Sequence, residues 1–270
     1  MEEVILSTLT SESQAHPTPT RYGSSGASST AGRGTHPLVR TARTTGLLYL
    51  ALVVAGVIGF MLVRTSLFVP GDATATLANL VERQGLARIG VAAELGIVLS
   101  QALLALWFYR LFRSVDGFAA GAVAGFGLVN AVAVLGSSAF LATALQVALD
   151  AALAPAGAAA ATAQLLYTVS SNLWAAGNLF FGLWLIPMGW LVVRSGWMPR
   201  ALGWVVTAGG AGYVLSAFIG ALAPGAGVVG EGLGYLAVVG EFWMIGYLLF
   251  IGVRPSAVRQ TAASTAELGS

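Results

Sequence analysis

Long apolar runs, separated by short stretches that carry arginine, glycine or proline, occupy the chain from about residue 44 onward. At about 1.5 Å per residue, each run is long enough to cross a hydrocarbon layer of ~30 Å as an α-helix. The pattern predicts an all-α, polytopic integral membrane protein, a six-transmembrane-helix bundle over residues 44–253. The predicted spans are Gly46–Val63, Arg88–Arg113, Phe118–Leu149, Leu173–Val193, Ala201–Leu222 and Gly232–Val253.

The segments between the spans carry helical patterns of their own. After the first span, Asp72 can cap a short helix with an apolar stripe at Leu77, Leu80 and Val81. We predict that this helix lies in the outer membrane interface instead of crossing the bilayer. Segment Ala158–Ser171 predicts another short helix, which leads into the fourth span.

Two spans have internal features that affect packing. The third run exceeds one crossing, so its helix either projects beyond the bilayer or breaks near Gly136. In the fifth span, Gly212, Ser216 and Gly220 recur every four residues. Such a face of small residues favours close packing against another helix.

The ends of the chain differ from its middle. Residues 1–43 are rich in Ser, Thr, Gly and Pro, which predicts a disordered tail, and residues 254–270 form a second polar tail. Ten of the 13 basic residues lie in these tails or in the loops after the second and fourth spans, and the other three, Arg64, Arg83 and Arg88, are placed in the remaining loops, on the opposite side. The positive-inside rule therefore predicts that both tails are cytoplasmic. We expect a multi-pass protein of the bacterial inner (plasma) membrane, whose first partner is the lipid bilayer.

Composition supports the membrane assignment and excludes several kinds of chemistry. The 270 residues are 57% hydrophobic and 9% charged, whereas soluble domains are near 25% charged. Cysteine and lysine are absent, and the two histidines, His16 and His36, both lie in the predicted tail. A thiolate site, a P-loop, a catalytic triad and a histidine metal site are thus disfavoured. We therefore expect no cofactor and no metal. We also expect no nucleic-acid partner, because the chain has no basic stripe with interleaved aromatic residues.

Polar residues within the spans are the candidate ligand-binding residues. Glu94 and Gln101 lie seven positions apart, so they share one face of the second span. Arg88 is a poor same-helix partner and no arginine lies deep in a predicted span, so we expect Glu94 to lack a cation and to be protonated. We predict that Glu94 faces the bundle interior near a polar group of another span. The candidates are Asn130, Asn178 and Glu241.

Four stretches together resemble a bacterial membrane protein family, domain of unknown function 4386. They are GLLYLALVVAG (46–56), VPGDATATLANL (69–80), the Glu94 span ending in LWFYRLFRSV, and RSGWMPRALG (194–203). The resemblance implies a multi-span α-helical membrane protein and no assigned activity. It also implies an acidic residue at Glu94 and a second one at Gln101, where this chain has an amide. A role that needs two carboxylates on this helix is therefore disfavoured.

Two functional interpretations remain from the sequence. In the first, the protein binds or moves a small polar ligand or a proton through a cavity around Glu94 and Glu241. In the second, it is a non-catalytic membrane subunit or scaffold whose buried acids are hydrogen bonds between packed helices, with a membrane protein as partner. An enzyme with one of these acids in its active site is a third and less favoured interpretation. Arg194 and Arg200 flank a tight cytoplasmic turn and are candidates for contact with lipid headgroups or a partner.

Overall fold

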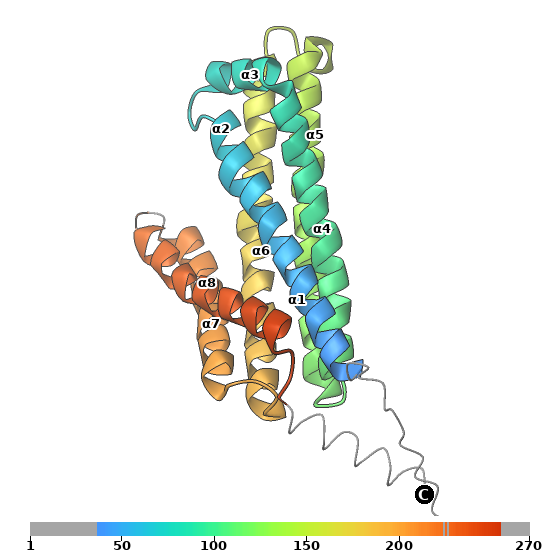
Figure 1. The fold of residues 1–270 in the computed structure, drawn as a ribbon. Coiled ribbons are helices and arrows are strands. Elements are labelled where there is room, and N and C mark those ends of the chain that lie inside the picture. Colours follow the sequence, from blue (N-terminus) through green and yellow to red (C-terminus); the bar gives the residue numbers. More distant parts are fainter. Residues whose placement is uncertain (1–36, 224, 226, 255–270) are drawn as a thin grey trace, which may run out of the picture. The chain divides into compact units, whose positions relative to one another are not determined.

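The computed structural model describes residues 37–223, 225 and 227–254, and every regular element in this part of the chain is a helix (Figure 1). The elements are α1 (Pro37–Gly56), η1 (Val57–Arg64), α2 (Thr65–Leu67), α3 (Ala73–Glu82), α4 (Gln84–Phe112), α5 (Gly117–Leu149), η2 (Ala151–Leu153), α6 (Ala159–Ser195), α7 (Arg200–Leu222) and α8 (Gly227–Phe250). The predicted all-α class is confirmed. Most of both predicted tails lies outside the described residues.

The first span is longer at both ends than its apolar run. α1, η1 and α2 form one apolar helical segment, Pro37–Leu67, of 31 residues. Its start within the predicted disordered tail is a correction. Proline suits the first turn of a helix, and arginine is a good helix former. The helix can therefore extend beyond the apolar run into the segment that carries these residues. The end is a second correction, because Arg64 lies inside the helical segment and not in a loop.

The middle helices extend well beyond a single crossing. α5 has 33 residues and α6 has 37, which correspond to about 50 and 55 Å of helix. α5 runs unbroken past Gly136, so the alternative of a break there is wrong. The short helix predicted over Ala158–Ser171 is not separate, because it continues directly into the fourth span as α6.

Five helical segments are long and apolar enough to cross a membrane: Pro37–Leu67, α4, α5, α6 and α7. The predicted sixth span corresponds to α8, of which Gly234–Phe250 is a shorter apolar stretch. α8 ends where Gly252 adopts a φ of 78°, and the Gly252 N–H donates to the carbonyl of Tyr247 at 2.8 Å. A left-handed glycine of this kind terminates a helix.

The helices pack mainly against their neighbours in sequence. α1, α4, α5 and α6 lie side by side, and α7 and α8 form a hairpin that packs on α6 and on α1 (Figure 1). α3 lies across one end of the bundle and contacts α4, α5 and α6. The predicted cap of α3 is confirmed, since Asp72 accepts a hydrogen bond from the Ala75 N–H at 2.9 Å. Of the predicted apolar stripe, Leu80 is buried whereas Val81 is exposed.

Glycines bring α6 and α7 together. A Cβ added at Gly182 would lie 2.7 Å from the carbonyl oxygen of Gly210, and one at Gly203 would lie 2.6 Å from that of Gly189. The predicted close packing of α7 is present, but Gly203 and Gly210 make it, and of the predicted stripe Gly212, Ser216 and Gly220 only Gly212 is buried. A Cβ at Gly220 would meet nothing within 4 Å, so the close approach lies nearer the start of α7.

The interior contains two apolar clusters with polar residues between them. One cluster includes Ile97 and Val134, and the other includes Ala87 and Leu141. Along α4 and α5, the polar residues Glu94 and Ser137 lie between members of the two clusters, and Ser170 has the same position on α6. The bundle therefore has a polar level in its interior, which is the natural place to search for a site.

Candidate functional site

A buried ion pair lies at the polar level. The Arg64 Nη2 lies 2.6 Å from Glu94 Oε1, and the two side chains are 6% and 1% exposed. Arg64 comes from η1 and Glu94 from α4. The expectation that Glu94 faces the bundle interior is correct. The expectation that it lacks a cation is wrong, and the partners named for it, Asn130, Asn178 and Glu241, do not bond to it.

Side chains of α5 and α6 complete the hydrogen bonds of this pair. Arg64 Nη2 also donates to Ser170 at 2.8 Å and Ser137 at 3.2 Å, and Nη1 donates to Ser171 at 2.9 Å. Ser137 donates to Glu94 Oε2 at 3.1 Å. The Trp174 indole N–H donates to Glu94 Oε1 at 3.3 Å. We call these residues the ion-pair cluster; both carboxylate oxygens in it are satisfied, and of the guanidinium only Nε has no partner.

Sequence reasoning missed Arg64 for a physical reason. The residue ends an apolar run, which resembles the arginine of a membrane boundary. In addition, Val57–Arg64 is π-helical, with more residues per turn than an α-helix, so the faces beyond Gly56 differ from those of a regular helical projection. The available signal was the presence of four polar residues in apolar helices: Glu94, Ser137, Ser170 and Ser171. Together they indicated that a buried cation was needed.

A separate cavity of about 170 Å³ lies beyond the polar level, within the apolar cluster that contains Ile97. It lies among α1, α4, α5, α6, α7 and α8, and four of the five candidate ligand-binding residues line it: Gln101, Asn130, Asn178 and Glu241. We call it the central cavity. The fifth candidate, Glu94, is not among its lining residues. The structure therefore divides the predicted site into the ion-pair cluster and the central cavity.

Gln101 is the least satisfied residue of the central cavity. Its side chain is fully buried, and neither its Oε1 nor its Nε2 has a hydrogen-bond partner among the described residues. Two glycines leave room for amide side chains that line the central cavity. A Cβ at Gly127 would lie 3.3 Å from Gln101 Nε2, and one at Gly177 would lie 3.0 Å from Asn130 Oδ1. An unpaired amide in a protein interior costs about 1 to 3 kcal/mol, so such groups ordinarily bind water or a ligand.

Glu241 provides the charge-bearing group of the central cavity. It is 8% exposed, and the Tyr49 hydroxyl donates to its Oε1 at 2.7 Å. Tyr49 is itself held between aromatic rings, stacked on Trp184 at 5.7 Å and edge-on to Phe108 at 5.9 Å. The ion pairs of the described residues, Arg64–Glu94 and Arg194–Asp116, do not include Glu241. Among the described residues, its carboxyl group is thus oriented by one hydroxyl and has no cation beside it.

The ion-pair cluster and the central cavity adjoin through α6. Trp174 and Asn178 line the central cavity and also a larger hollow of about 460 Å³, which Arg64, Phe60 and Ser171 line as well. Trp174 stacks at a tilt on Phe60, with ring centroids 4.9 Å apart. Trp174 and Asn178 therefore lie between the central cavity and the hollow beside the ion-pair cluster, and a change in the Trp174 side chain would affect both.

The remaining candidates lie at the far end of α6. Arg194 pairs with Asp116 at 3.1 Å and packs over the Trp190 ring at 4.7 Å, whereas Arg200 is exposed. The predicted tight turn is present, with Gly196 at a φ of 64° ending α6 and Pro199 preceding α7. No group of three or more His, Cys, Asp or Glu side chains that could hold a metal ion occurs in the described residues.

These helices and their polar interior define a protein with several apolar, membrane-length α-helices and a buried site between them. The chain belongs to the family described as domain of unknown function (DUF4386), whose family model matches residues 44–252. The resemblance found from the four sequence stretches is thereby confirmed. No curated protein and no solved structure matches the chain.

Proposed function

We propose that this protein is a membrane receptor or carrier that binds a small polar ligand in the central cavity. The observation that carries the proposal is Gln101, which is fully buried, lines the cavity and uses neither its donor nor its acceptor within the described protein. Membrane interiors lack the water that would satisfy such an amide, so a polar occupant is the economical explanation. The size is consistent, because about 170 Å³ is several times the ~30 Å³ of one water molecule but less than a drug-sized pocket.

The second interpretation, a structural role for buried acids, has an observation in its favour at Glu94. Both oxygens of Glu94 are bonded, and its cation is supplied by Arg64 of the same chain. Both oxygens of Glu94 and both terminal nitrogens of Arg64 are already bonded within the protein, and only Arg64 Nε has no partner among the described residues, so we assign the ion-pair cluster to helix packing. The two interpretations thus apply to two different glutamates, and proton or ligand binding at Glu94 is no longer needed.

We further propose six spans with both termini in the cytoplasm of a bacterial cell, and the inner membrane as the location. The α4–α5 turn, the α6–α7 turn and the end of α8 gather arginines, and Arg194 and Arg200 are suited to anionic lipid headgroups there. α8 supplies the sixth crossing. α3 is the outer interfacial helix, with Leu77 and Leu80 directed to the bundle and Val81 to lipid.

Solvent access to the central cavity tests the ligand-binding proposal. The chain has no cysteine, and Gly56 lines the cavity with nothing within 4 Å of an added Cβ, so Gly56→Cys introduces a thiol there at little structural cost. The small, neutral, polar reagent 2-hydroxyethyl methanethiosulfonate should modify this thiol in the purified protein. An Ala144→Cys variant, fully buried in an apolar cluster, should not react. Equal, negligible rates at both positions would show a closed cavity and contradict the proposal.

Gln101→Leu provides the matched functional variant. Leucine removes the two unpaired polar groups, so the free protein should be as stable as the parent or more stable. If acetamide protects the Gly56→Cys thiol from modification, the Gln101→Leu substitution should remove that protection. A substantial loss of stability would instead mean that Gln101 has essential protein partners, which would remove the basis of the proposal.

A further inference from the structure

The electrostatics of the central cavity indicate the charge of its occupant. Glu241 is buried in a span and receives one hydrogen bond, from Tyr49. The other buried glutamate of the described residues, Glu94, has Arg64 at 2.6 Å, so this bundle does supply a cation where a carboxylate is part of the packing. A carboxylate inside a membrane protein is costly without an opposite charge. A bound ligand can therefore supply the positive charge that Glu241 lacks, whereas an anionic ligand would be repelled.

Three aromatic side chains form part of the wall of the central cavity. Trp174, Phe181 and Tyr213 line the cavity together with Glu241. Phe181 and Tyr213 are held edge to face, with ring centroids 5.3 Å apart, so the wall is ordered by its own packing. Faces of such rings attract organic cations, and the attraction is stronger where water is excluded. A small, strongly hydrated metal ion gains much less from this surface than an ammonium group with methyl or methylene substituents.

The amides supply the remaining specificity. Gln101 is unpaired at both atoms within the described part of the chain, and Asn130 and Asn178 also line the cavity. Amide carbonyl oxygens accept hydrogen bonds from N–H donors, and each amide can also donate to a hydroxyl or carbonyl elsewhere in the same ligand. With about 170 Å³ available, the occupant has only a few non-hydrogen atoms.

From these three features we propose that the central cavity binds a small organic ammonium ion. Glu241 neutralises its charge, Trp174, Phe181 and Tyr213 surround its apolar substituents, and the Gln101 carbonyl accepts from an N–H group where one is present. This inference rests on the proposed ligand-binding function and adds to it the chemical class of the ligand. It assigns Glu241, and not Glu94, as the residue that determines selectivity.

Charge-selective modification of Gly56→Cys tests the proposal in the full-length protein in detergent or nanodiscs. The cationic reagent 2-aminoethyl methanethiosulfonate should react at least about tenfold faster than its anionic sulfonatoethyl counterpart, because a buried negative charge raises the local concentration of cations. Tetramethylammonium and methylammonium chloride should slow the reaction and raise the melting temperature saturably, whereas sodium chloride at equal ionic strength should do neither. Glu241→Gln should abolish both effects, and Asp116→Asn, an acid outside the cavity, should preserve them.

The competition measurement needs no change at Glu241, so it remains decisive if Glu241→Gln does not fold. Equal protection by sodium chloride would overturn the organic part of the proposal. Protection by acetamide but not by either ammonium ion would overturn the ligand class while supporting the ligand-binding function. A Gly56→Cys thiol that none of the three reagents modifies would overturn the proposed function itself, and the inference with it.

Discussion

Glu94 and Glu241 are both buried acids in apolar helices, yet their surroundings give them different roles. Glu94 is bonded through both oxygens and paired with Arg64, whereas Glu241 accepts from Tyr49 and borders a cavity. A buried ion pair seldom stabilises a fold more than well-packed apolar residues would, but removing one member leaves an uncompensated charge. The energetic importance of Arg64 and Glu94 is therefore mutual, and each is required chiefly because the other is present.

Substitution of the pair should reveal this mutual dependence. Arg64→Met and Glu94→Gln should each lower the free energy of unfolding by about 3 to 5 kcal/mol, because the remaining charge is buried without its partner. The double variant should recover more than half of either loss. Denaturation in detergent, analysed as a double-mutant cycle, measures the coupling.

A surface ion pair provides the control for that cycle. Asp116→Asn removes the Arg194–Asp116 pair, whose side chains are 53% and 24% exposed, and asparagine can still cap α5. It should cost less than about 1 kcal/mol. If the losses of Arg64→Met and Glu94→Gln simply add in the double variant, the two residues act independently and the assignment of the ion-pair cluster to packing is wrong.

For single residues, the sequence predicted whether a side chain faces the interior better than it predicted the residues that bond to it. The cost of a charge in lipid was enough to predict that Glu94 faces inward, and its 1% exposure confirms this. From the sequence, Gln101, Asn130, Asn178 and Glu241 were only possible neighbours. Their position in one cavity could not be predicted, because no local pattern shows which spans meet at a given depth. Arg64 was missed since its inward direction depends on the π-helical turns before it.

Among the elements, α6 is the one on which the site depends most. It contributes Ser170, Ser171 and Trp174 to the ion-pair cluster and Asn178 and Phe181 to the central cavity. Its other face packs on α7 through glycines that allow backbone to meet backbone. This close packing has no room for a side chain, so it holds α6 at a fixed distance from α7 and fixes the depth at which Trp174 and Asn178 lie.

Alanine substitution of glycines should separate packing positions from open ones. A Cβ at Gly182 would lie 2.7 Å from the Gly210 carbonyl oxygen and 2.9 Å from the Val214 nitrogen, and backbone atoms cannot turn aside. Gly182→Ala should therefore destabilise by about 1 to 3 kcal/mol. Gly121→Ala on α5 is the matched control, because nothing lies within 4 Å of its added Cβ. It should be neutral or stabilise by up to about 1 kcal/mol through helix propensity. Melting temperatures in detergent give the comparison, and a Gly182→Ala protein that melts with the parent would refute close α6–α7 packing.

The lengths of the helices were predictable only where the apolar run and the helix begin and end at the same residues. The sequence interpretation ended the first span at Val63 and separated Ala158–Ser171 from the fourth span because polar residues interrupt both runs. In the structure the helical hydrogen bonding continues through Arg64 and through Ser170, whose side chains bond to each other inside the bundle. Tertiary contacts thus satisfy polar groups that a hydropathy pattern interprets as a boundary. The α6–α7 turn, by contrast, was predictable because Gly196 and Pro199 act locally.

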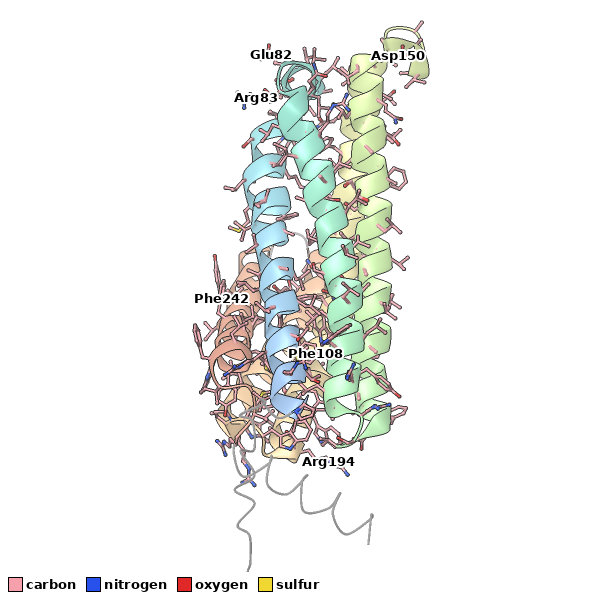
Figure 2. The ribbon with its side chains drawn as sticks, turned by 45° about the vertical axis from the view of Figure 1, so that its right-hand side comes forward. Glu82, Arg83, Phe108, Asp150, Arg194 and Phe242 are labelled. Atoms are coloured by element: carbon pink, nitrogen blue, oxygen red, sulfur yellow. The ribbon has the colours of Figure 1, made fainter. Side chains whose placement is uncertain are left out.

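For the whole molecule, the distribution of charge defines two different ends. Arg194 lies at one end of the bundle, and Glu82, Arg83 and Asp150 lie at the other (Figure 2). The ends of α6 and α8 meet near Arg194, where the Arg254 N–H donates to the Trp197 carbonyl at 3.0 Å. Burial of Arg64 removes one of the three arginines that the sequence interpretation placed outside, so the asymmetry of the exposed arginines is greater than predicted. Greater asymmetry strengthens the expectation that the Arg194 end is cytoplasmic.

Labelling at the two ends of α5 tests this orientation. Ser114 and Ala152 are both exposed, they flank the same helix Gly117–Leu149, and both accept cysteine conservatively. Because about 50 Å of helix separates them, they should lie on opposite sides of a hydrocarbon layer of ~30 Å. A membrane-impermeant maleimide should modify Ala152→Cys in intact cells and modify Ser114→Cys only after the membrane is opened. The parent, which has no cysteine, supplies the background. Labelling of Ser114→Cys alone in intact cells would invert the topology, and labelling of both would mean that α5 does not cross the membrane.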